Sequence, residues 1–140
     1  MLNYNQALPE KKTLQDLQME EIKPIMKLII RGKKREFISA VGKSLNILLP
    51  IEANTSTQSD KFTALWLSPD EWMIFSNEPV DENTNNYDAE KLLNDKISKI
   101  NLGAVTDVSD QFVIIKLKGN KIYELFRTGS PFNFNDFQNK

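Results

Sequence analysis

The 140-residue chain contains neither cysteine nor histidine. Without cysteine it has no disulfides, thiol nucleophiles, zinc fingers or cysteine-ligated iron–sulfur clusters. Without histidine it has no Ser-His-Asp or Cys-His catalysis, and a metal site would have oxygen ligands only. It also lacks a glycine-rich nucleotide loop, because Gly32 stands alone where such a motif needs two or three glycines. We therefore expect no catalytic, cofactor-binding or metal-binding residues.

Long hydrophobic runs are missing as well, since polar residues and prolines interrupt the apolar stretches. A membrane span needs about 20 apolar residues, so we expect no membrane partner, and we expect no nucleic-acid partner either. The first residues lack the basic start and apolar run of a signal peptide, which predicts a cytoplasmic protein. Hydrophobic residues make up 40% of the chain and charged residues 26%, a balance typical of a globular domain.

Residues 1–21 contain few apolar side chains and Pro9, which predicts an N-terminal arm that is mobile or lies on a neighbour. Residues 22–140 form the predicted domain. Hydrophobic periodicity, glycines and prolines indicate about six strands and three helices, hence an α+β fold with a mixed, largely antiparallel sheet. The expected strands span 25–31, 46–51, 62–67, 72–75, 104–108 and 112–117, the last with a fully buried face. The expected helices span 33–41, 88–100 and 119–126, and the expected loops 54–60 and 78–86.

The strands at 62–67 and 72–75 flank the sequence Ser68-Pro69-Asp70-Glu71. Proline at the second position of a turn, followed by aspartate, is typical of a tight turn between antiparallel strands. We therefore expect a β-hairpin here, in which Asp70 and Glu71 have a structural role.

Four basic residues, Arg31, Lys33, Lys34 and Arg35, surround the start of the first expected helix. Free backbone N–H groups at a helix start favour anions, so these residues form a candidate anion site. The alternative is a solvated helix start without a ligand, and Gly42 is expected to end this helix.

Asp107, Ser109 and Asp110 follow an expected strand. Their oxygens could bind a metal ion or act as a general base. The alternative is a turn in which they accept hydrogen bonds from backbone N–H groups.

Trp66, Trp72 and Phe75 lie in the expected hairpin. Three aromatic rings could stack on a flat ligand ring such as a pterin or flavin, or they could belong to the hydrophobic core.

Three segments together resemble a known family. Residues 65–72, LWLSPDEW, resemble the LWLGPDEWL block of the gamma subunit of heterotetrameric sarcosine oxidase. Residues 104–111, AVTDVSDQ, are similar to a strand of that family, and 129–134, GSPFNF, to the segment that follows, with Ser130 where cysteine is usual. The resemblance extends from about Ile25 to Phe137.

This resemblance implies a fold related to the folate-binding domain of the glycine-cleavage T-protein. It implies a non-catalytic gamma-type subunit that assembles with alpha, beta and delta subunits. In such a complex, sarcosine is oxidatively demethylated to glycine and the one-carbon unit passes to tetrahydrofolate. FAD, FMN, NAD and tetrahydrofolate belong to the larger subunits. The other hypothesis is a stand-alone folate or small-anion binding protein that uses the basic residues Arg31 to Arg35.

Family members continue beyond the phenylalanine segment with further strands and a helix, so this chain is C-terminally short by comparison. We expect an unpaired sheet edge near Phe132, Phe134 and Phe137, and edges of this kind are normally covered. These phenylalanines are therefore a candidate subunit interface, with weak self-association of the isolated chain. Alternatively, they fold back and complete the chain's own core.

Overall fold

The computed structural model describes residues 5–79 and 88–134 and divides the chain into two compact units. The larger unit is residues 23–112, and the smaller combines residues 1–22 with 113–140. The predicted α+β class is confirmed, with antiparallel strands in two sheets. Within the predicted N-terminal arm, residues 12–14 and 17–21 form two strands that pair with each other, and the second also pairs with a strand from the C-terminal half.

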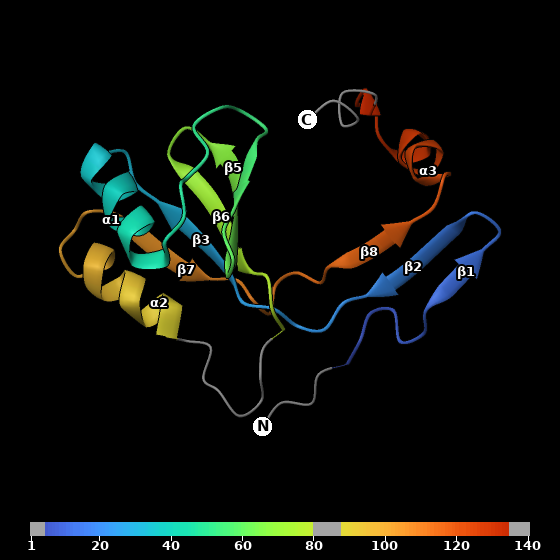
Figure 1. The fold of residues 1–140 in the computed structure, drawn as a ribbon, viewed down its shortest axis with the longest axis horizontal. Helices are drawn as coiled ribbons and strands as arrows, with labels where there is room; N and C mark the ends of the chain where they lie inside the picture. Colours follow the sequence, from blue (N-terminus) through green and yellow to red (C-terminus); the bar gives the residue numbers. More distant parts are fainter. Residues whose placement is uncertain (1–4, 80–87, 135–140) are drawn as a thin grey trace. The chain divides into compact units, whose positions relative to one another are not determined.

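The larger unit is built on a five-stranded antiparallel sheet with helices on one face (Figure 1). Its strand order is β4-β5-β6-β3-β7. The strands are β3 (Lys27–Arg31), β4 (Ser56–Gln58), β5 (Phe62–Ser68), β6 (Glu71–Ser76) and β7 (Ala104–Asp107). The helices are α1 (Arg35–Leu45), α2 (Asp88–Leu93) and the π-helical turn η1 (Asn94–Ser98), which continues α2.

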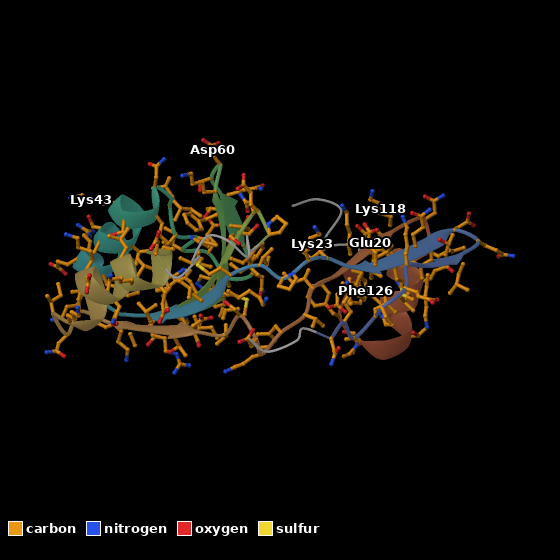
Figure 2. All side chains as sticks on the ribbon, turned by 90° about the horizontal axis from the view of Figure 1, so that it is seen from below. Glu20, Lys23, Lys43, Asp60, Lys118 and Phe126 are labelled. Atoms are coloured by element: carbon orange, nitrogen blue, oxygen red, sulfur yellow. The ribbon has the colours of Figure 1, made fainter. Side chains whose placement is uncertain are left out.

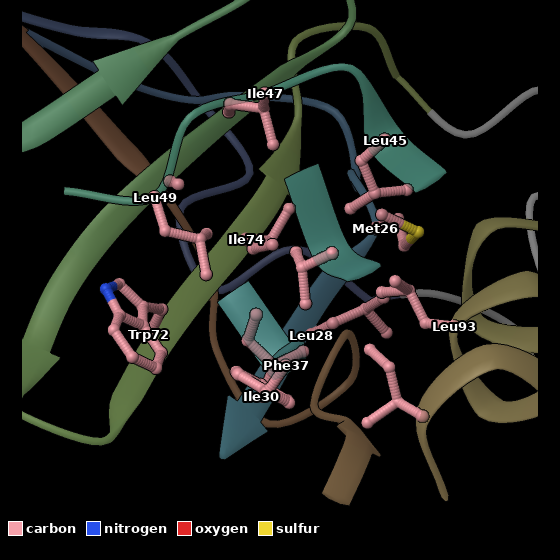
Figure 3. Close-up of a cluster of buried hydrophobic side chains, with 13 residues drawn as sticks. Met26, Leu28, Ile30, Phe37, Leu45, Ile47, Leu49, Trp72, Ile74 and Leu93 are labelled. Carbon is pink, nitrogen blue, oxygen red and sulfur yellow. The ribbon is translucent and has the colours of Figure 1, made fainter. Parts of the chain in front are cut away.

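The hydrophobic core lies between this sheet and its helices (Figure 3). Alternate residues of the central strands face the helices, so Leu28 and Ile30 of β3 are fully buried while their neighbours point to the other face. Helical spacing brings Phe37 and Val41 of α1 onto them. The buried cluster is Met26, Leu28, Ile30, Phe37, Val41, Leu45, Ile47, Leu49, Ala64, Trp72, Ile74, Leu93 and Ile97.

The hairpin at Ser68–Glu71 is confirmed, since β5 and β6 pair antiparallel with Trp66 opposite Trp72. The register shifts between Trp66 and Ser68, which is a bulge just before the turn. The hairpin is tied to β3, because the Gly32 N–H donates to the Asp70 carbonyl at 3.0 Å.

Helix α1 does not end at Gly42, as predicted, but continues to Leu45. The left-handed residue that ends it is Asn46, with φ 51° and ψ 50°, a conformation that asparagine tolerates. A side chain at position 42 would crowd the Ile47 carbonyl. The glycine therefore provides space for the returning chain, and the Ile47 N–H donates to the Gly42 carbonyl at 3.2 Å.

The predicted strand at 46–51 is also wrong. This segment alternates like a strand, since Ile47 and Leu49 are buried whereas Leu48 and Ile51 are 81% and 79% exposed. It lies over the core without joining a sheet ladder. The strand that pairs with β5 at this edge of the sheet is β4, which lies inside the predicted loop 54–60, and Ser56 pairs with Leu65.

In its described residues, the smaller unit has a three-stranded antiparallel sheet of order β1-β2-β8 and one helix (Figure 2). Met19 of β2 lies opposite Leu117, and Glu20 opposite Lys116. The predicted buried face of the last strand is not found, because Val113 and Ile115 are exposed. The elements are β1 (Lys12–Leu14), β2 (Leu17–Glu21), β8 (Ile115–Lys118) and α3 (Ile122–Gly129).

Candidate functional site

The basic residues around the start of α1 lie next to the acidic hairpin turn. The Arg31 Nε is 2.9 Å from the Glu71 Oε1, and the Lys33 Nζ is 3.7 Å from the Asp70 Oδ2. The register explains the first pair, because Arg31 and Glu71 are cross-strand neighbours of β3 and β6. The hydrogen bond to Glu71 raises the pKa of Arg31 above its ordinary value. Two of the four predicted anion-binding residues therefore already face carboxylates.

The other two basic residues, Lys34 and Arg35, begin α1. Lys34 occupies the N-cap position with extended backbone, and its side chain makes no capping hydrogen bond. Its carbonyl accepts the N–H of Phe37 at 3.0 Å. Lys34 and Arg35 are exposed, and neither lines the hollow beside Leu17 and Lys121 or the one beside Leu45 and Phe62.

Asp107 and Ser109 form the turn that was one of the two predicted alternatives. The Ser109 N–H donates to the Asp107 Oδ1 at 2.8 Å, and the Lys27 N–H donates to the Ser109 Oγ at 2.9 Å. The Val108 N–H in turn donates to the Lys27 carbonyl at 2.9 Å. These bonds fix the end of β7 against the start of β3. Within the described residues, no group of three acidic side chains could hold a metal ion.

Sequence analysis missed the residue at the centre of this network. Lys27 is the one charged side chain among the buried described residues, with 3% of its surface exposed. Its Nζ donates to the Ile25 carbonyl at 3.0 Å. Burial lowers the pKa of Lys27, and the nearby Asp110 and Asp107 oppose this shift. The alternation of β3, with Leu28 and Ile30 facing the helices, would place Lys27 on the other face, but no sequence signal shows that this face is covered there.

The three aromatic residues of the hairpin do not gather on one ligand. Trp66 and Trp72 are cross-strand partners facing the core, whereas Phe75 is on the opposite face of β6. Trp72 is fully buried, and its Nε1 donates to the Pro50 carbonyl at 2.7 Å. The structure thus assigns the tryptophans to the core.

The C-terminal phenylalanines form a ring cluster with α3. Phe134 is buried, stacked on Phe126 with ring centroids 5.1 Å apart, and it meets Phe132 edge-on at 5.3 Å. Phe132 is 47% exposed. Phe137, the third predicted interface residue, lies outside the described residues.

The larger unit is thus an α+β domain with helices on one face of an antiparallel sheet, and its central hairpin turn carries the sequence Pro-Asp-Glu-Trp. A model of the sarcosine oxidase gamma subunit family matches residues 31–137, and the chain belongs to this family. The comparison with curated proteins found no match.

A solved structure confirms the fold. The heterotetrameric sarcosine oxidase from Corynebacterium sp. U-96, in complex with pyrrole 2-carboxylate, contains a chain that superposes with a TM-score of 0.71 at 19% sequence identity. The match covers 84% of this chain and 57% of that chain, so the present sequence spans little more than half of its structural relative.

Proposed function

We propose that this chain is a non-catalytic gamma-type subunit of a heterotetrameric sarcosine oxidase in the cytoplasm. It assembles with alpha, beta and delta subunits, and the larger alpha and beta subunits hold FAD, FMN, NAD and tetrahydrofolate. Those subunits carry out the demethylation of sarcosine to glycine and pass the one-carbon unit to tetrahydrofolate. The observation that carries the proposal is the family match over residues 31–137, which the similar fold supports. Among residues 5–79 and 88–134, every helix is too short or too polar to span a bilayer.

The alternative of a stand-alone folate or anion binder is less favoured. Its candidate residues include Arg31 and Lys33, whose charges already face Glu71 and Asp70. An incoming anion would have to compete with these carboxylates for both cations.

The test is co-expression of the tagged chain with the alpha, beta and delta subunits, followed by capture on the tag. We expect all three to co-purify in equal amounts with flavin absorbance and sarcosine-dependent peroxide formation. Capture of the chain alone, while the other subunits form an active complex without it, would contradict the proposal. Titration of the chain purified alone with tetrahydrofolate tests the alternative.

A further inference from the structure

We draw no further inference here: the strongest candidate, the exposed apolar pair Leu48 and Ile51 on the extended segment that follows helix α1, carries none because nothing in the structure shows what covers it.

Discussion

Trp72 stacks on Phe37 with ring centroids 5.9 Å apart and an interplanar angle of 29°. This contact joins the β5–β6 hairpin to helix α1. The hydrogen bond from the Trp72 indole to the Pro50 carbonyl also joins the hairpin to the segment that follows α1. Gly32 and Gly103 lie against the Phe37 ring, where a Cβ on either would overlap it. The family's tryptophan motif is thus the anchor of the larger unit's core.

The first prediction concerns the two tryptophans of the hairpin. Trp72→Ala should lower the free energy of unfolding by roughly 3–5 kcal/mol, because it leaves a cavity against Phe37 and removes the Pro50 bond. Trp66→Ala should cost less, since this side chain is only partly buried at the margin of the core. Urea denaturation of both variants measures this. A stable Trp72→Ala protein that no longer binds its partner subunits would assign the residue to binding instead.

The second prediction concerns space around Phe37. Gly103→Ala should destabilise the chain by roughly 1–3 kcal/mol, because the added Cβ meets both the ring and the Arg31 carbonyl. Gly129→Ala is the matched control, since a Cβ there meets nothing within 4 Å. We expect the control to melt at or slightly above the wild-type temperature, as alanine favours a helix more than glycine. Equal losses in both variants would contradict the packing argument.

The fold could be predicted where local chemistry decides it. The turn at Pro69-Asp70 defined the hairpin, and periodicity placed α1 and the α2–η1 segment within a few residues. The strand prediction for 46–51 was wrong because the alternation of apolar and polar residues indicates burial and not backbone hydrogen bonding. Ile47 and Leu49 are buried by packing on the core, with no neighbouring strand. The strands at 12–21 were missed because they are short and largely polar, and because β2 pairs with β8 from the other end of the sequence.

Several members of the candidate site were predictable from the sequence, but Lys27 and the contacts between the residues were not. Sequence placed Asp107 and Ser109 after a strand, and both of the alternatives considered used their oxygens. Only the register of β3 and β7 shows that they fix Lys27. Likewise, Arg31 and Glu71 lie next to each other because β3 pairs with β6, and these two residues are forty positions apart in the sequence.

The third prediction uses the lowered pKa of buried Lys27. Between that lowered pKa and the ordinary value of 10.5, the unfolded chain binds more protons than the folded chain. Folding stability from this residue therefore rises as the pH rises through that window, and it is constant below it. Lys27→Met, which keeps the volume without the charge, should be as stable as the wild type or more stable at neutral pH.

Chemical denaturation at several pH values checks this difference. The advantage of Lys27→Met over the wild type should shrink as the pH rises toward 10.5. Lys43→Met, on the exposed surface of α1, is the control for the loss of a lysine charge outside the buried network. A gap between Lys27→Met and wild type that is the same at every pH would contradict the assignment.

The fourth prediction concerns the isolated subunit. Purified alone, the chain should show no flavin absorbance and should oxidise neither sarcosine nor dimethylglycine, because the proposed function leaves these cofactors to the larger subunits. When the chain is mixed with the purified larger subunits, the absorbance spectrum of their flavins should stay unchanged. A stoichiometric flavin spectrum from the chain alone would overturn the non-catalytic assignment.

The last prediction separates two phenylalanines of the predicted interface, Phe132 and Phe134. Phe134 is 8% exposed and stacks on Phe126, so Phe134→Ser should destabilise the smaller unit by several kcal/mol. Phe132 is about half exposed and should be dispensable for folding. Its removal should nevertheless reduce the weak self-association that we expect of the isolated chain, because an exposed ring is then no longer available to a second copy.

Sedimentation of wild type, Phe132→Ser and Phe134→Ser over a concentration series distinguishes these roles, with circular dichroism as the folding control. We expect Phe132→Ser to stay folded and monomeric at concentrations where the wild type begins to associate. A wild type that remains monomeric throughout would show that the phenylalanines only complete the chain's own packing. If Phe132→Ser unfolds as readily as Phe134→Ser, the edge-on contact of Phe132 with Phe134 is needed for folding, and the prediction that Phe132 is dispensable is wrong.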